Sequence, residues 1–120
     1  MLEFPKSERL CSKKTIELLF KEGKVEFLYP YRVVFSIKDQ PDKIPPQVLF
    51  AVSRKNFKKA VHRNWIRRRM KEAYRLNKTQ LADKDGNYRI SSMGFMYIAK
   101  EKMPFQEIEK KILQIFKRFR

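Results

Sequence analysis

The side chains best suited to chemistry in this sequence are cationic, and they are densest between Phe57 and Leu76. This stretch contains no Gly or Pro and consists of good helix formers, so we expect one long helix there. Residues three, four or seven positions apart share one side of a helix. The planar guanidinium forks of arginines gathered on one side match phosphate oxygens. The polar residues that share this side are Asn64, Arg67, Arg68, Lys71 and Arg75.

The charges on this side of the helix all have the same sign. Glu72 is the only acid between Phe57 and Leu76, and it lies outside the group. Like charges four residues apart, such as Arg67 and Lys71, destabilise a helix by about 0.2–0.5 kcal/mol. A phosphodiester backbone offsets that cost, because basic side chains displace its condensed counterions. A basic face that is merely solvated is the alternative.

Positive charge continues upstream of this helix. Basic residues occupy the expected turn between a strand and the helix, where Ser53 either offers its hydroxyl to a phosphate oxygen or simply ends the strand. The position of Ser53 supports both interpretations equally. The basic residues of this region are Arg54, Lys55, Lys58 and Lys59.

The whole chain is strongly basic. Its 120 residues include 29 Lys and Arg against 13 Asp and Glu, which gives a net charge of +16. Such a balance predicts a polyanionic partner, which could be nucleic acid, an acidic lipid surface or an acidic protein. The length predicts one domain spanning residues 1–120.

Several classes of protein are disfavoured. No run approaches the roughly 18 apolar residues of a membrane span, and the first residues lack the pattern of a secretory signal. Cys11 is the only cysteine, which excludes an internal disulfide and favours a reducing, cytoplasmic setting. His62 is the only histidine, so we expect no zinc site of the usual kind and no metal held tightly by the protein.

Catalytic groups are equally scarce. Asp39 and Asp42 flank a proline loop, and Asp83 and Asp85 lie in another loop, where aspartates typically serve turns. The sequence suggests neither a Ser-His-Asp arrangement nor a glycine-rich phosphate loop. We therefore expect no catalytic residue on the protein.

The elements that position these side chains follow from hydrophobic periodicity. We expect a first helix from about Ser12 to Lys21, ended by Gly23, and a last helix that begins near Pro104. β-branched and aromatic runs predict three strands. The expected strands are 31–37, 48–53 and 95–99, and the expected loops are 38–46 and 78–92.

This order of elements, α-β-β-α-β-α, predicts an α+β sandwich of helices on a small sheet. The separation of the first two strands favours an antiparallel hairpin with a long loop. Tyr31, Val33 and Phe35 point to one face of the first strand, and Arg32 and Val34 point to the other. One face must be core, and an open face with aromatic and basic residues would stack single-stranded bases. Periodicity alone does not identify the open face.

The long helix carries a motif, Arg63-Asn64-Trp65-Ile66-Arg67-Arg68-Arg69-Met70-Lys71-Glu72, that resembles the "RNR" helix of the bacterial ribonuclease P protein component. The stretches 50–55, 59–61, 19–24 and 97–100 are similar to other segments of that family in the same order. The resemblance covers essentially the whole chain. The sequence departs from the family at Leu49, where a glycine is common, and in the turn after Arg54 and Lys55. The positions that match the RNR motif are Arg63, Asn64, Arg67, Arg68, Lys71 and Glu72.

The resemblance implies a protein subunit of ribonuclease P, in which a large RNA is the catalyst and holds magnesium ions as cofactors. The RNA would remove the 5′ leader of precursor tRNA, while the protein would bind the ribonuclease P RNA through the RNR helix and the leader in a cleft between the first helix and the sheet. The implied fold is a small α/β sandwich of four or fewer strands with a left-handed crossover. No protein partner is predicted.

The candidate site residues follow from this resemblance. For RNA binding they are Arg63, Asn64, Arg67, Arg68, Lys71, Arg54 and Lys55, and for the leader cleft they are Phe20, Val33, Phe35, Ser53 and Arg54. The main alternative function is that of a structural ribosomal protein that binds rRNA. A DNA-binding regulator is a further alternative, but it would need a short helix where 48–53 predicts a strand.

Overall fold

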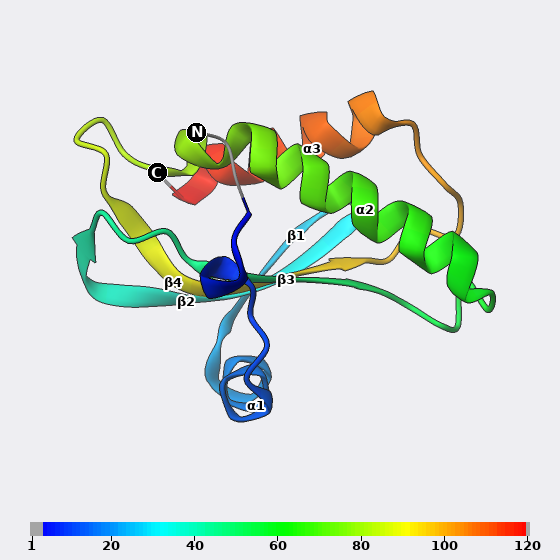
Figure 1. The fold of residues 1–120 in the computed structure, drawn as a ribbon, viewed down its shortest axis with the longest axis horizontal. Helices are drawn as coiled ribbons and strands as arrows, with labels where there is room; N and C mark the ends of the chain where they lie inside the picture. Colours follow the sequence, from blue (N-terminus) through cyan, green and yellow to red (C-terminus); the bar gives the residue numbers. More distant parts are fainter. Residues whose placement is uncertain (1–3, 120) are drawn as a thin grey trace.

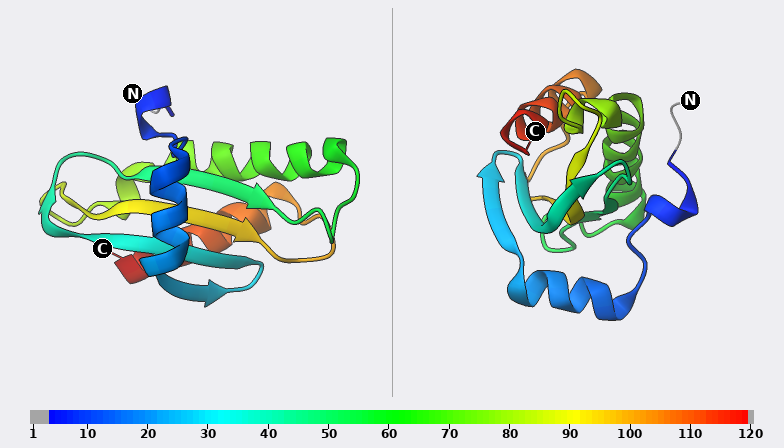
Figure 2. Two further views of the ribbon diagram at one scale, coloured as in Figure 1. Left: turned by 90° about the horizontal axis from the view of Figure 1, so that it is seen from below. Right: turned by 90° about the vertical axis from the view of Figure 1, so that its left-hand side faces the viewer.

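The computed structural model describes residues 4–119, which form one four-stranded sheet with helices on both faces (Figure 1). Two long helices cover one face of the sheet, and a shorter helix crosses the other (Figure 2). The elements are η1 (Lys6–Glu8), α1 (Lys13–Glu22), β1 (Lys24–Leu28), β2 (Tyr31–Asp42), β3 (Gln47–Val52), α2 (Ala60–Asn77), η2 (Lys78–Leu81), β4 (Tyr88–Tyr97) and α3 (Phe105–Phe119).

The strands lie in the order β1-β2-β4-β3. β2 is antiparallel to both β1 and β4, whereas β3 runs parallel to β4. From the α1 side, with β3 and β4 both running to the right, the chain leaves the upper strand β3, passes behind the sheet as α2 and returns to the lower strand β4 (Figure 2). This path is left-handed, a rare hand for a parallel crossover.

The structure confirms the predicted fold class and the succession of helices and strands, with one strand added. β1 was not expected, because its five residues include Lys24 and Glu26 and give only a weak strand signal. β4 begins at Tyr88, inside the stretch expected to be a loop. The predicted hairpin of neighbouring strands is wrong, because β4 inserts between β2 and β3.

β2 also extends into the region expected to be a loop. Its pairing with β4 is irregular there, since Ile37 pairs with Ile90 but the next paired residue, Asp42, lies opposite Tyr88. Pro41 falls within this irregular part, where it interrupts no regular ladder.

The ends of α1 match their predicted signals. The Ser12 side chain accepts a hydrogen bond from the Thr15 amide, and the Gly23 amide donates to the Leu19 carbonyl. A Cβ at Gly23 would come within 2.4 Å of the Leu19 carbonyl oxygen, so any larger residue there would displace the chain. The chain therefore turns from α1 into β1 at a residue without a side chain.

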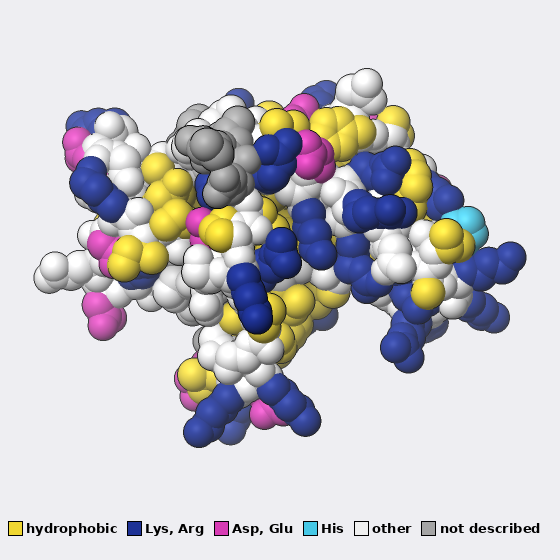
Figure 3. Space-filling model, viewed as in Figure 1, with side chains coloured by type: hydrophobic (Ala, Val, Ile, Leu, Met, Phe, Trp, Pro, Cys, Tyr) yellow, Lys and Arg dark blue, Asp and Glu magenta, His cyan; other side chains and the backbone are white. Residues whose placement is uncertain are grey.

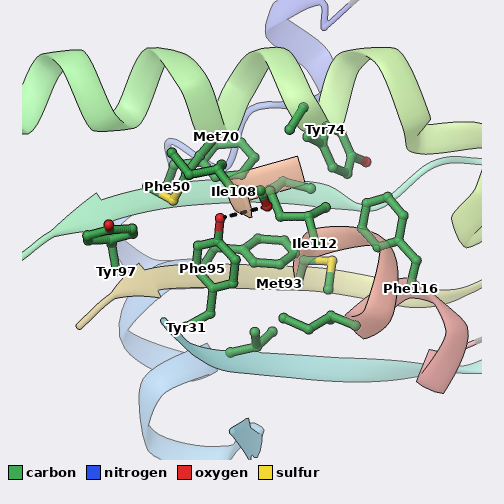
Figure 4. Packing of buried hydrophobic residues seen from close by; sticks show 14 of the residues in the cluster. Tyr31, Phe50, Met70, Tyr74, Met93, Phe95, Tyr97, Ile108, Ile112 and Phe116 are labelled. Atoms are coloured by element: carbon green, nitrogen blue, oxygen red, sulfur yellow. Dashed lines mark hydrogen bonds between the residues drawn. The ribbon is translucent and has the colours of Figure 1, made fainter. Parts of the chain in front are cut away.

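The main core lies between the sheet and the pair α2 and α3 (Figure 4). Tyr31 and Phe50 both pack against Phe95, with ring centroids 5.8 Å and 5.5 Å from it. α2 contributes a fully buried stripe to this core, and α3 contributes a second. The stripes consist of Ile66, Met70, Ala73 and Tyr74 on α2, and of Ile108, Ile112, Ile115 and Phe116 on α3.

The N-terminal segment spans the side of the molecule where β3 meets α2. Phe4 packs edge-on against the rings of Phe50 and Tyr74. Lys78 Nζ donates a hydrogen bond to Glu8 Oε1 at 2.9 Å and forms an ion pair with it. Both side chains are largely buried. These contacts tie the segment that leads into α1 to the end of α2.

Two buried tyrosines make a matched pair for a stability measurement. The Tyr31 hydroxyl donates to the Ile108 carbonyl at 3.1 Å, whereas the Tyr74 hydroxyl has no hydrogen-bond partner among the described residues. Burial raises the pKa of Tyr74, so its hydroxyl stays neutral. Because this hydroxyl has no partner among the described residues, its hydrogen-bonding capacity is unused. We expect Tyr31→Phe to lower the free energy of unfolding by about 1 kcal/mol and Tyr74→Phe to raise it by a similar amount.

Urea denaturation of the two variants tests this expectation, because both lose one hydroxyl from a fully buried ring. Equal destabilisation by the two substitutions would show that the Tyr74 hydroxyl is as well satisfied as that of Tyr31.

Candidate nucleic-acid interface

The side of α2 that faces away from the sheet carries the predicted cationic group. Asn64, Arg67, Arg68 and Lys71, together with Val61, line a shallow hollow of about 410 Å³. The Arg67 guanidinium donates a hydrogen bond to the Asn64 side-chain oxygen, which holds these two side chains together. Among the described residues, Arg68 and Lys71 have no carboxylate partner. We call Asn64, Arg67, Arg68 and Lys71 the α2 cationic face.

The stripe of α2 that is buried in the core fixes the direction of this face. Ile66, Met70 and Tyr74 are fully buried, and the cationic residues lie on the remaining, outward side. Figure 3 shows Lys and Arg side chains gathered over α2 and around the turn that precedes it. The core thus presents the charges to solvent as one surface.

Arg63 has a different position from the rest of the motif. One nitrogen of its guanidinium, Nη1, donates to the carbonyls of Phe57 and Lys58, both at 2.8 Å. The side chain is half-buried and folds back on the chain that leads into α2. The structure therefore places Arg63 as a brace for this turn, beside the α2 cationic face.

Arg75, at the far end of the same side, is paired with the one acid of the helix. Its Nε and Nη2 lie 3.1 Å and 2.6 Å from the two carboxylate oxygens of Glu72. The hydrogen bond from Arg75 lowers the pKa of Glu72, so this acid is ionised at neutral pH. The unneutralised charge on this side of α2 is thereby concentrated between Asn64 and Lys71.

The turn between β3 and α2 continues the positive surface. Arg54 and Lys55 are exposed, and the half-buried Ser53 accepts a hydrogen bond on its Oγ from the Lys55 amide at 3.1 Å. Asn56 donates to the Ile98 carbonyl at 3.2 Å and ties the turn to the end of β4. The turn is thus held in place while its two cations stay accessible.

α1 lies across the sheet on the face opposite α2 and α3 (Figure 2). It packs through Leu19 onto Val34, with Leu10 beside them and Ile16, Leu49 and Met96 at the margin. Strand register places Val34 in one row across the sheet with three other residues. This row beneath α1 consists of Val25, Val34, Gly94 and Leu49.

The side chain of Leu49, where the family commonly has glycine, has room because its partner in the row lacks a side chain. The paired residue on β4 is Gly94, and a Cβ there would lie 4.0 Å from the Leu49 side chain. A leucine therefore fits beneath α1 without displacing the helix.

The next row on this face, two residues further along each strand, is open on the side of the basic turn. Register aligns Phe27, Arg32, Met96 and Ala51 across the four strands. Phe27 and Arg32 are exposed, and Met96 and Ala51 are half-exposed. We call this set the aromatic–basic row.

Phe20 projects from α1 toward the aromatic–basic row. Its ring is 45% exposed. It lies on the flank of α1 opposite Thr15 and Glu22, which line a hollow on the other side of the helix. Hydrophobic side chains occupy the space between α1 and the cationic end of α2 (Figure 3). The structure thus brings Phe20, Ser53 and Arg54 to one side of α1.

The prediction of Val33 and Phe35 as cleft residues is wrong. Val33 is fully buried and Phe35 is 5% exposed, and both belong to the core on the α2 and α3 face. Phe35 packs against Phe119 of α3, with ring centroids 4.4 Å apart. α3 covers the face to which these residues point, so the open face carries their neighbours instead.

Sequence reasoning missed the aromatic–basic row. Alternation did place Arg32 opposite Tyr31 and Val33, but it could not rank the two faces. Phe27 was missed because β1 itself was not predicted, and Met96 because its pairing partners depend on the strand order.

Neither a metal cluster nor a membrane span is found in the described part of the chain. Between residues 4 and 119, no three His, Cys, Asp or Glu side chains lie close enough to hold a metal ion together. No helix in the same range has the length and apolar character needed to cross a membrane.

Comparisons with known proteins agree with this geometry. A family model described as "Ribonuclease P" matches residues 4–120. The "Ribonuclease P protein component" of Porphyromonas gingivalis is 37% identical over 106 residues, which cover 88% of this chain and 77% of that protein.

The fold is also similar to solved structures. The RNase P protein from Thermotoga maritima superposes with a TM-score of 0.74 at 25% identity, covering 94% of this chain and 98% of that one. The RNase P protein of Staphylococcus aureus, 17% identical, has the same fold with a TM-score of 0.71 over 94% of this chain and 95% of that one. The family match over nearly the whole chain, together with this shared fold, shows that the chain belongs to the ribonuclease P protein family and is a protein subunit of that endonuclease.

Proposed function

We propose that this subunit binds the ribonuclease P RNA through the α2 cationic face and the 5′ leader of precursor tRNA along the aromatic–basic row beside α1. The observation that carries the proposal is the α2 cationic face itself, whose Arg68 and Lys71 are exposed and have no acidic partner among the described residues. Folded RNA supplies the closely spaced phosphates that such a surface fits.

The leader proposal is supported by the chemistry of the side chains beside α1. Phe20 and Phe27 offer exposed rings, and Arg32, Arg54 and Lys55 offer cations. Aromatic stacking and backbone charge tolerate any base, which suits a single strand of variable sequence. Ser53 accepts a hydrogen bond from the Lys55 amide, which leaves its hydroxyl proton free to donate to a phosphate oxygen.

In this proposal the protein binds and positions RNA, and the RNA subunit carries the bond-breaking chemistry. The magnesium ions of the reaction are held mainly by that RNA. We place the reaction in the cytoplasm. A purely structural rRNA-binding role is not favoured, because the matched relatives are ribonuclease P proteins.

Reconstitution tests the proposal as a whole. The chain is mixed with a bacterial ribonuclease P RNA at a magnesium concentration too low for the RNA alone to work well. We expect cleavage of precursor tRNA to increase on addition of the protein. No gain over RNA alone would contradict the proposal.

The α2 cationic face can be tested by the salt dependence of RNA binding. We expect Arg68→Ala and Lys71→Ala each to weaken binding to the RNA subunit and to reduce the slope of log K against log salt by about 1. Lys84→Ala, in the exposed turn at the opposite end of the sheet, is the matched control and should leave the slope unchanged. An unaltered slope in both helix variants would remove this face from the phosphate contacts.

The leader site can be tested by comparing precursor with mature tRNA in the holoenzyme. Because stacking on an aromatic ring contributes about 1–3 kcal/mol per base, Phe20→Ala should weaken precursor binding by at least about fivefold. Arg32→Ala should act in the same direction, and neither variant should alter the affinity for mature tRNA. Ile44→Ala, which truncates an exposed apolar side chain distant from α1, is the control. Equal losses for both RNAs would place Phe20 and Arg32 outside the leader site.

A further inference from the structure

The sheet face crossed by α1 continues on both sides of the helix (Figure 2), and its second side lies away from the aromatic–basic row. Two residues further along the strands from Val34 and Gly94, register aligns Ser36 on β2, Ser92 on β4 and Gln47 on β3. Above them, the flank of α1 opposite Phe20 encloses a hollow of about 350 Å³. We call it the serine hollow, and its lining is Thr15, Leu18, Leu19, Glu22, Gly23, Ser36, Ser91 and Ser92.

The serine hollow is separate from the proposed leader site. The apolar contact of Leu19 with Val34, flanked by Ile16 and Leu49, fills the space beneath α1 between them. Along β2, Arg32 and Ser36 are four residues apart, or about 13 Å at the usual strand rise. The two sites therefore lie on opposite sides of one helix, within reach of one RNA strand.

The hydroxyls of the hollow have unused hydrogen-bonding capacity. Ser91 Oγ lies 2.6 Å from Ser36 Oγ and donates to the Ser36 carbonyl at 3.2 Å, so Ser36 donates to Ser91 and keeps its lone pairs free. Ser92 is only 8% exposed, and its hydroxyl has no partner among residues 4–119. Ser92 lines the hollow, so its hydroxyl is open to a ligand there.

The charge of the lining excludes a phosphate as the group bound inside. No Lys or Arg lines the serine hollow, although the chain has a net charge of +16, and the one ionisable group there is the carboxylate of Glu22. A cation is also disfavoured, because Glu22 is exposed and an exposed ion pair contributes little against the positive field of the whole protein.

An uncharged ligand with hydrogen-bond donors and a flat apolar part fits these features. Ribose hydroxyls or a base amino group can donate to Ser36 and Ser92, while Leu18 and Leu19 offer apolar contact to a ring and the exposed Glu22 stays at the rim. The volume lies within the range of small-ligand sites. We propose that the serine hollow binds a nucleoside moiety, with any attached phosphate outside. The choice of a nucleoside rests on the proposed RNA-binding function.

The experiment titrates the isotope-labelled full chain with adenosine and follows its amide resonances. We expect saturable shifts at Ser36, Ser91 and Ser92, and none there with inorganic phosphate. Ser92→Ala should weaken adenosine binding about fivefold, as the loss of one hydrogen bond predicts. Ser7→Ala, at an exposed serine of η1, is the matched control and should bind as the unaltered chain does.

Two further variants keep the test decisive. Ser92→Leu should fill the hollow and abolish the shifts, and Glu22→Gln, an exposed change that leaves folding intact, should preserve adenosine binding because the ligand is uncharged. Three results would each overturn the proposal. The first is the absence of saturable shifts, and the second is their persistence in Ser92→Leu. The third is the loss of the shifts in Glu22→Gln combined with displacement of adenosine by spermidine.

The source of the nucleoside is then separated in the holoenzyme. If it belongs to the leader, Ser92→Ala weakens binding of precursor but not of mature tRNA. If it is a free nucleoside, Ser92→Ala weakens adenosine binding and leaves the affinities for both tRNAs unchanged. Either result supports the site. Failure of the RNA-binding proposal itself would appear instead as unchanged affinity of Arg68→Ala and Lys71→Ala for the RNA subunit. That measurement does not involve adenosine.

Discussion

The burial of one side of α2 is the constraint on which the functional surface depends. Each fully buried side chain such as Ile66 or Met70 contributes about 1.5–3 kcal/mol. Repulsion between like charges one turn apart costs about 0.2–0.5 kcal/mol per pair. The core therefore holds a row of cations together at little net expense, and the repulsion remains available to be relieved by a bound polyanion.

The second determinant is the position of α1 across the sheet. Because Leu19 fixes the helix over Val34, one face of the four-stranded sheet is divided into two sides of opposite character. One side combines the exposed ring of Phe27 with the charge of Arg32, and the other gathers hydroxyls around Ser92. A single short helix thus gives one sheet face two chemically distinct surfaces.

Local patterns carried the successful predictions, and long-range contacts account for the errors. The α2 cationic face was predictable because helical spacing alone places Arg67, Arg68 and Lys71 together. The assignment of Val33 and Phe35 failed because the open face is decided by α3, some seventy residues later in the chain. The inward position of Arg63 was equally hidden, since it depends on the path of the turn at Phe57 and Lys58.

The ion pair between Glu8 and Lys78 has a consequence for the order in which the molecule is built. Its partners are 70 residues apart, so the N-terminal segment cannot reach its final place until the end of α2 has been synthesised. Non-local contacts of this kind slow folding, because the intervening chain must first be ordered. During translation α1 therefore docks onto the sheet late. The surfaces on both of its flanks are completed only in the last stages of folding.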